Sequence, residues 1–186
     1  MVGQRQKRAP VCGVIAVTCA GLAPSKNVKR VVIVGRGAAG KSVLAARLGE
    51  ITGLPVIELD KHFWQPGLAA TPPDRWAAVQ RRLAQRQSWI MDGDLGPYDV
   101  PGPRLEAADT VIVLDFPLLR CAWRALHRSR ERGDFWRWLL TYRCRSRPTI
   151  LKAIAADIPR AEVHVLSSPR AVRRFLAQVT RYASPR

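Results

Sequence analysis

Eight consecutive residues constrain the fold of this chain more than any others: Gly35-Arg36-Gly37-Ala38-Ala39-Gly40-Lys41-Ser42. They match the pattern G-x-x-x-x-G-K-[ST] of the phosphate-binding P-loop. An apolar, β-branched run at residues 31–34 comes directly before them, and a helical pattern of apolar residues follows. Because the motif requires a strand before it and a helix after it, the sequence predicts an α/β domain that binds a nucleotide.

Each residue type in this loop has a physical role. Glycine lets successive backbone N–H groups turn toward one phosphate, and the N-terminus of the following helix adds partial positive charge. Lys41 supplies a mobile cation for the β- and γ-phosphates, and the Ser42 hydroxyl can bind Mg²⁺. We therefore predict that residues 35–42 bind ATP, with Lys41 as a catalytic cation and Ser42 as a metal ligand.

Segments with strand and helix patterns alternate along residues 28–186. Further strands are expected at 55–60, 88–93, 110–114 and 162–166, and further helices at 74–87, 118–132, 134–142, 149–156 and 169–181. This alternation predicts one α/β domain, a parallel sheet with helices on both faces. The carboxyl ends of its strands then meet at one edge of the sheet, where ligands bind.

The charge of the chain indicates anionic partners without choosing among them. The sequence holds 31 basic and 14 acidic residues, a net charge of +17. Nucleotides, nucleic acid and acidic lipid all suit such a balance, and so does a solvated basic surface combined with a basic tail. No apolar run is long enough to cross a bilayer, so we expect a cytoplasmic protein with no membrane partner.

The first 27 residues differ from the rest of the chain. A basic stretch at 4–8 and a mildly apolar stretch at 11–23 have the order of a secretory signal, but the apolar part is weak and Pro24 disfavours cleavage. We expect a disordered extension or an over-early start codon. The four cysteines, Cys12, Cys19, Cys121 and Cys144, form no C-x-x-C pair. Free, reduced thiols are therefore expected rather than a zinc site.

Three acidic residues compete for the role of metal ligand. Mg²⁺ beside a P-loop needs a carboxylate at the end of a neighbouring strand, and Asp60, Asp92 and Asp115 each follow an apolar run. Pattern alone favours Asp115, because Val-Ile-Val-Leu precedes it. Each acid is equally suited to capping a turn or a helix. Adjacency to the P-loop strand should decide among them.

Residues 118–148 carry an unusual number of arginines. Arg120, Arg124 and Arg128 are spaced i, i+4, i+8, so they share one face of a helix. Six more arginines follow, at 130, 132, 137, 143, 145 and 147. Fixed guanidinium groups stabilise the charge of a phosphoryl group in transfer, so we predict a lid-like arm in which Arg124 and Arg128 are catalytic. The alternative is a solvated helix face; the tryptophans at 123, 136 and 138 are expected to pack the arm onto the body.

Several segments together resemble one family. They are residues 35–42, 59–67, 89–94, 108–115, 121–124 and 145–148. They resemble the small adenylate-kinase-like proteins known as topology modulation proteins, over about residues 28–180. The resemblance implies the nucleoside-monophosphate-kinase fold, with a five-stranded parallel sheet of order 2-3-1-4-5 and helices on both faces.

The resemblance also implies roles for individual residues. Asp92-Gly93 corresponds to an Asp-Gly pair whose acid helps to hold Mg²⁺, which moves the metal prediction from Asp115 to Asp92. The residues expected to face the phosphoryl acceptor are Asp60, Trp64, Gly93, Arg145 and Arg147.

Two positions depart from the family pattern. Asp94 stands where the family commonly has Asn, and Phe116-Pro117-Leu118 lacks the arginine that often follows the fourth strand. Either Arg120 takes the place of that arginine one turn later, or the site is weakened. The short region after the fourth strand makes a large lid domain improbable.

Two functions are consistent with these observations. The first is a Mg²⁺-dependent small kinase that transfers the γ-phosphoryl group of ATP to a nucleoside monophosphate or another small acceptor. If the acceptor is a hydroxyl, Asp60 is the candidate general base. The alternative is a nucleotide-regulated P-loop protein that binds nucleic acid through its basic surface.

Overall fold

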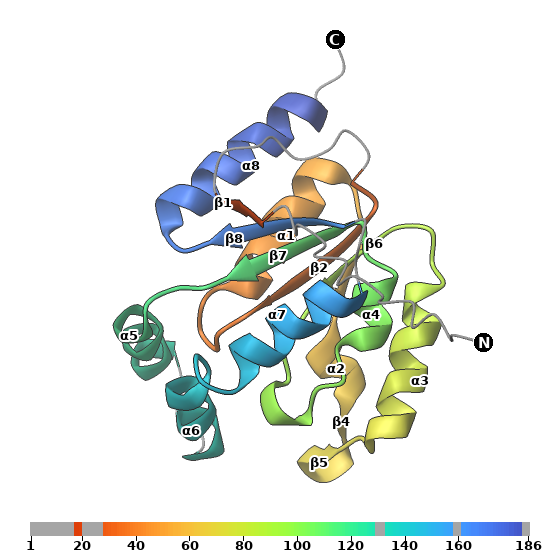
Figure 1. Cartoon of the computed structure of the whole chain (residues 1–186), viewed down its shortest axis with the longest axis vertical. Helices are drawn as coiled ribbons and strands as arrows, with labels where there is room; N and C mark the ends of the chain where they lie inside the picture. The colour runs from red at the N-terminus through yellow and green to blue at the C-terminus, as the bar shows by residue number, and fades with distance from the viewer. Residues whose placement is uncertain (1–16, 20–27, 129–132, 158–160, 184–186) are drawn as a thin grey trace, which may run out of the picture.

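The protein is built around one parallel sheet covered by helices (Figure 1). A computed structural model describes residues 17–19, 28–128, 133–157 and 161–183. The strands lie in the order β1 (Val17–Cys19), β8 (Glu162–Leu166), β7 (Thr110–Leu114), β2 (Arg30–Gly35), β6 (Trp89–Asp92) and β3 (Val56–Glu58). When β1 is left aside and the other five strands are numbered in chain order, their order across the sheet is 2-3-1-4-5. The predicted fold class and strand order are therefore confirmed.

Strand β1 is an addition to the expected sheet. It pairs in parallel with β8 at the edge, and its three residues come from the segment that we expected to be disordered. The rest of residues 1–27 lies outside the described residues.

Alternate residues of the central strand face two different cores. Val31 and Ile33 lie in the core between the sheet and two helices, α1 (Lys41–Thr52) and α8 (Pro169–Ala183). Val32 and Val34 contact the opposite side, which is covered by three helices. These are α3 (Pro73–Ala84), α4 (Gly102–Glu106) and α7 (Ser146–Asp157). Burial on both faces explains why β2 is a continuous apolar run.

Two helices lie beyond the carboxyl ends of the strands and contact each other. They are α5 (Leu118–Arg128) and α6 (Gly133–Thr141), and we call them the lid helices. Residues 129–132 between them lie outside the described residues, and so do the arginines at 130 and 132. The lid helices correspond to most of residues 118–148, the arginine-rich arm expected from the sequence.

The second expected strand is shorter than predicted. It ends at Glu58, and α2 (Leu59–Phe63) replaces its last two residues. Leu59 and Phe63 lie one helical turn apart and are both fully buried, so this short helix turns one face toward the core. A small antiparallel hairpin follows, made by β4 (Trp64–Gln65) and β5 (Ala69–Ala70) around the 3₁₀ turn η1 (Pro66–Leu68). Asp60 therefore lies on a short helix and not at the end of a strand.

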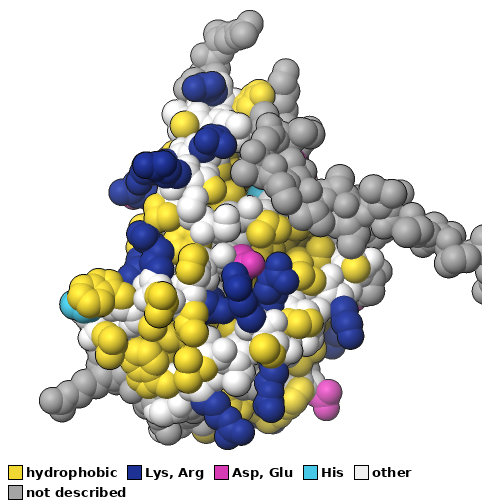
Figure 2. Space-filling model, turned by 60° about the vertical axis from the view of Figure 1, so that its left-hand side comes forward, with side chains coloured by type: hydrophobic (Ala, Val, Ile, Leu, Met, Phe, Trp, Pro, Cys, Tyr) yellow, Lys and Arg dark blue, Asp and Glu magenta, His cyan; other side chains and the backbone are white. Residues whose placement is uncertain are grey.

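The surface that carries the lid helices is both basic and apolar. Figure 2 shows lysine and arginine side chains in several groups, beside a broad patch of hydrophobic side chains.

Cys121 is buried, Cys144 is exposed, and both are free thiols. Among the described residues, no helix combines the length and apolar character needed to cross a membrane.

Candidate active site

One cavity of about 1340 Å³ lies at the carboxyl edge of the sheet, between the P-loop, the loop after β6 and the lid helices. The predicted site residues that line it are Gly37, Ala38, Gly40, Lys41, Ser42, Asp60, Trp64, Asp92, Gly93, Arg124 and Arg145. Four others, Gly35, Arg36, Ala39 and Arg147, do not line it. The side chain of Arg128, the last residue of α5, lies outside the described part of the structure. Three distant segments are thus brought together around one space.

The P-loop curls around its own backbone. Ala38 and Gly40 have positive φ angles of 56° and 97°, and the N–H of Ala39 donates to the carbonyl of Arg36 at 3.2 Å. Lys41 Nζ donates to the carbonyl of Gly35 at 2.9 Å and lies beside the helix N-terminus of α1. The ammonium and the N-terminus concentrate positive charge at one point, as an anion site requires.

Arg36 is part of the loop, but its side chain points away from the cavity. It is 1% exposed, and its Nη1 donates to the carbonyl of Phe116 at 3.2 Å. Its guanidinium carbon also lies 5.3 Å from the centre of the Tyr142 ring. The side chain of Arg36 therefore anchors the loop to the segment after β7 and does not line the cavity.

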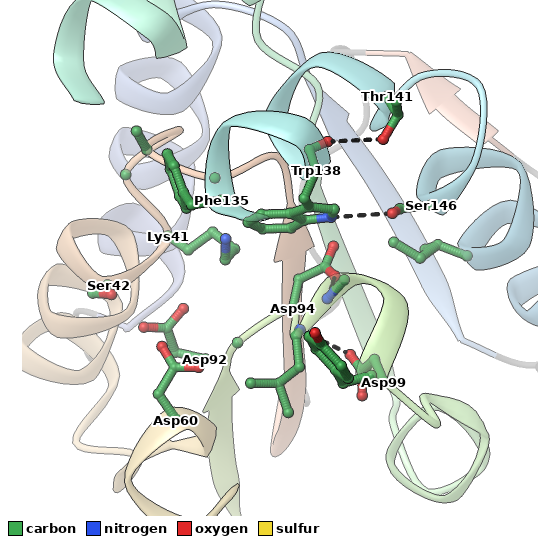
Figure 3. Close-up of a pocket in the computed structure, with 18 of the residues that line it drawn as sticks. Lys41, Ser42, Asp60, Asp92, Asp94, Asp99, Phe135, Trp138, Thr141 and Ser146 are labelled. Atoms are coloured by element: carbon green, nitrogen blue, oxygen red, sulfur yellow. Dashed lines mark hydrogen bonds between the residues drawn. The ribbon is translucent and has the colours of Figure 1, made fainter. Parts of the chain in front are cut away.

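Two carboxylates face each other below Lys41 and Ser42 (Figure 3). Asp92 ends β6, where it pairs with Ile33 of the P-loop strand, and Asp60 comes from α2. Burial, reinforced by the negative charge of Asp92 and opposed by Lys41, raises the pKa of Asp60 above its ordinary value. The negative charge of Asp92 therefore favours the protonated form of Asp60.

Ser42 and Asp92 offer the oxygen ligands that a magnesium ion would need. Mg²⁺ is commonly held by one or two protein carboxylates together with substrate phosphates and water. A hydroxyl and one carboxylate beside a phosphate cradle fit that requirement. No cluster of three or more acidic, His or Cys side chains suited to a metal occurs among the described residues.

Asp115 has a different environment. Strand β7 also pairs with β2, so adjacency to the P-loop strand does not separate Asp115 from Asp92. Asp115 instead accepts a hydrogen bond from Arg147 Nε at 3.1 Å, and neither residue lines the cavity. Asp115 is the metal candidate that the apolar run alone favoured, and Arg147 is one of the residues predicted to face the acceptor. Both are engaged in this ion pair outside the cavity.

Arg124 connects the lid helix α5 to the P-loop. Its Nη1 donates to the carbonyl of Ala39 at 3.1 Å, and a Cβ atom on Gly40 would lie only 2.9 Å from the same nitrogen. Arg120, the proposed substitute for the absent arginine, is exposed and lies 5.8 Å from the Phe116 ring. It does not line the cavity. Of the two, only Arg124 contacts the loop.

Trp138 of α6 fills the space between the P-loop and the loop after β6. A Cβ on Gly37 would lie 2.8 Å from the Trp138 ring, and one on Gly96 would lie 2.6 Å from its indole nitrogen. The indole N–H donates to Ser146 Oγ at 3.1 Å, and Lys41 Nζ lies 5.8 Å from the ring centre (Figure 3). The sequence pattern anticipated that this tryptophan packs against the body, but it carried no signal for its place against two glycines.

A buried ion pair supports the loop after β6. Arg104 is fully buried and donates both Nη groups to Asp99, at 2.8 and 2.5 Å. Arg104 also donates to Gln80 Oε1 of α3 at 2.7 Å. Burial alone would raise the pKa of Asp99, but the charge and hydrogen bonds of Arg104 hold it below its ordinary value. Nothing in the local sequence indicated the contact with Gln80, because Arg104 lies on α4 and Gln80 lies on α3.

Asp94 connects the loop after β6 to the P-loop. One carboxylate oxygen accepts from the N–H of Gly35 at 3.4 Å, and the other accepts from the N–H of Gly96 at 3.0 Å. Burial, opposed in part by Lys41, raises the pKa of Asp94. The residue that departs from the family pattern is therefore a structural bridge between the two loops.

Comparison with known proteins places this arrangement in a structural class. No family model matches the chain, and no curated protein matches it in sequence. A gluconokinase from Sinorhizobium meliloti 1021 is 24% identical, with a TM-score of 0.51 over 83% of this chain and 93% of that one. A shikimate kinase from Acinetobacter baumannii, in complex with shikimate, is 18% identical, with a TM-score of 0.56 over 83% and 92%.

A sugar kinase from Janibacter sp. HTCC2649 is also similar, at 22% identity and a TM-score of 0.50 over 84% of this chain and 92% of that one. This chain has the small P-loop kinase fold. At such identities the fold is what is shared, and membership of the topology modulation family is not confirmed.

The end of the kinase-fold cavity away from the lid helix α5 has an aromatic wall. Trp64 is 39% exposed and Tyr98 is 48% exposed, and their rings lie 6.2 Å apart in an edge-to-face arrangement. Asp60 and the exposed Arg145 line the same cavity. Tyr98 was missed by sequence reasoning, because the turn η2 (Gly96–Tyr98) that carries it has no helix or strand periodicity.

Proposed function

We propose that this protein is a Mg²⁺-dependent phosphotransferase that moves the γ-phosphoryl group of ATP to a small acceptor. The observation that carries the proposal is the convergence of Lys41, Ser42, Asp92 and Asp60 on one cavity, although they come from three separate segments. The kinase folds of the gluconokinase, the sugar kinase and the shikimate kinase support the same reaction class.

The residues divide the work of phosphoryl transfer between them. The backbone of residues 35–42 binds the phosphates, and Lys41 neutralises charge on the β- and γ-groups. Arg124, and by its spacing Arg128, stabilise the charge that develops on the transferred group. Ser42 and Asp92 would hold Mg²⁺, which neutralises phosphate charge when it is bound.

The acceptor is the open part of this proposal. The family resemblance implies the nucleoside-monophosphate-kinase fold but names no acceptor, and the names of the similar structures suggest sugars, sugar acids or shikimate-like acids. A nucleoside monophosphate is therefore one candidate among these. For a hydroxyl acceptor, Asp60 would act as general base, and its raised pKa suits that role. For a phosphate acceptor no base is required. Trp64, Gly93 and Arg145 would form the acceptor wall.

A phosphoryl-transfer screen tests the proposal. The full chain is incubated with ATP and Mg²⁺ against nucleotides, sugars, sugar acids and shikimate-like acids, and phosphorylated product is measured. We expect transfer to at least one acceptor, and a rate about 10²–10³-fold lower in Lys41→Ala, which removes a fixed charge from the transition state. Lys61→Ala is the matched control, because Lys61 pairs with Glu58 on the surface. No transfer by the wild type, or undiminished transfer in Lys41→Ala, contradicts the proposal.

The nucleic-acid alternative rests on the net charge of +17, on the absent arginine after the fourth expected strand and on the undefined acceptor. It stays a prediction, and steep weakening of RNA or DNA binding between low and moderate salt would be its test.

A further inference from the structure

The cavity continues past the P-loop to an exposed aromatic pair on α5. Trp123 is 65% exposed, contrary to the expectation that it packs the arm onto the body, yet it lines the cavity together with His127. The two rings lie 4.0 Å apart, centre to centre, with 37° between their planes. His127 therefore covers one face of the indole, and the exposure of Trp123 leaves the other face open.

This aromatic pair is held in a defined orientation. His127 Nδ1 lies 2.8 Å from the carbonyl of Trp123. Because a carbonyl only accepts hydrogen bonds, the proton must be on Nδ1, which fixes the tautomer and the ring orientation. The neighbouring Arg124 is bound to the carbonyl of Ala39, so the helix that carries the pair is attached directly to the P-loop.

The position of the pair corresponds to one end of a bound nucleotide. Lys41 marks the β- and γ-phosphates in a P-loop, and the two carboxylates Asp60 and Asp92 lie beside it. Helix α5 lies well apart from α2 in the view of Figure 1. Val43 follows Ser42, is 57% exposed, and lines the cavity together with Trp123. The cavity thus extends from the phosphate site along Val43 to an open aromatic face.

We propose that the open face of Trp123 is the stacking site for the base of the nucleotide donor. This inference rests on the proposed function and assigns the subsite that the P-loop itself does not provide. A planar base matches the indole face, and stacking on an aromatic side chain accepts any base, so ATP and GTP should both bind. The acceptor has its own aromatic wall at Trp64 and Tyr98, at the other end of the cavity.

Binding of one ligand with a nucleoside and one without it tests this assignment. ADP and pyrophosphate are titrated calorimetrically, with Mg²⁺, into the full-length wild type, Trp123→Ala and Trp123→Phe. We expect Trp123→Ala to weaken ADP binding by about 5- to 150-fold and to leave pyrophosphate binding unchanged, since the lost contact is to the base. Trp123→Phe should retain most of the affinity. Leu119→Ala is the matched control, because Leu119 is 84% exposed on the same helix and does not line the cavity.

Each other outcome has a defined meaning. Unchanged ADP binding in Trp123→Ala overturns the assignment, and so does equal weakening of ADP and pyrophosphate. A loss in Leu119→Ala as large as in Trp123→Ala also overturns it, because the effect would then belong to the apolar surface of α5. Lys41→Ala should weaken both ligands. A wild type that binds neither ligand overturns the nucleotide donor itself, whereas a wild type that binds both while Trp123→Ala behaves normally overturns only the base site.

Discussion

The two sides of the cavity are built in different ways. The P-loop side is one continuous stretch held by its own backbone, as in the hydrogen bond from Ala39 N–H to the carbonyl of Arg36. The opposite side, from Asp94 to Pro101 together with α6, is held by side chains from distant elements. Arg104 of α4 donates to Gln80 of α3, 24 residues away in the sequence.

This difference explains why the donor is easier to infer than the acceptor. A backbone cradle depends on glycine at set positions and on the helix that follows, so its code is local. A wall held by contacts such as that of Arg104 on α4 with Gln80 on α3 depends on which helices meet in the fold. In the proposed reaction the acceptor would contact that wall, so its identity depends on tertiary contacts rather than on a local motif.

Removing Arg104 should cause the largest effect and tests whether the opposite side depends on buried pairing. Arg104→Met leaves the carboxylate of Asp99 buried without its partner, so the free energy of unfolding should fall by about 3–5 kcal/mol. Urea unfolding measures it. Arg81→Ala, on the exposed face of α3, should stay within about 0.5 kcal/mol.

The double variant Arg104→Met with Asp99→Leu separates two causes of that loss. It removes both charges and should recover part of the stability. A loss below about 1 kcal/mol in Arg104→Met would mean that buried pairing contributes little to this side, and the contrast between the two sides would fail.

Replacing the carboxylate of Asp92 or of Asp115 by an amide tests the P-loop side. Asp92→Asn should lower phosphoryl transfer by about 100-fold or more, because a metal ligand contributes several kcal/mol to the transition state. Added Mg²⁺ should recover part of the rate. Asp115→Asn is the control, since its carboxylate pairs with Arg147 outside the cavity. Equal losses in the two variants, or a larger loss in Asp115→Asn, would contradict the assignment of the metal to Asp92.

The sequence predicted most of the fold because its signals are local. Alternating apolar runs gave the strands and helices, and the end of α1 at Thr52 followed from Gly53, which has a φ of 71°. It erred at Leu59, where the chain leaves the sheet and begins α2 although the expected strand continued to Asp60. Local periodicity does not record which neighbours an element will have.

The site was predicted only in part, because local patterns do not record which residues will meet in the fold. The length of the apolar run favoured Asp115, but the contact that separates it from Asp92 is with Arg147, 32 residues later. Likewise, Trp138 of the arm covers the P-loop and Trp123 is exposed, although both were expected to pack the arm onto the body. Trp138 meets Gly37 and Gly96, and Trp123 meets no such pair of glycines.

Replacing Asp94 should cause the smallest effect, and it tests the bridge between the two sides. Because the pKa of Asp94 in the folded protein is raised above its ordinary value of 3.8, folding favours the protonated form. Raising the pH through the window above 3.8 therefore costs the wild type stability, and Asp94→Asn should not suffer that loss. We expect the Tm of Asp94→Asn to exceed that of the wild type by about 2–4 °C at neutral pH. The difference should shrink as the pH is lowered toward 4.

Thermal unfolding at both pH values measures this difference, with Asp74→Asn on the exposed first turn of α3 as the control. A neutral side chain relieves the burial of charge but keeps only one acceptor oxygen for the N–H groups of Gly35 and Gly96. If the wild type is the more stable protein at neutral pH, its two hydrogen bonds outweigh the cost of burying the charge. The ionised carboxylate would then be what joins the P-loop to the wall that faces it, and the two sides would not be independent.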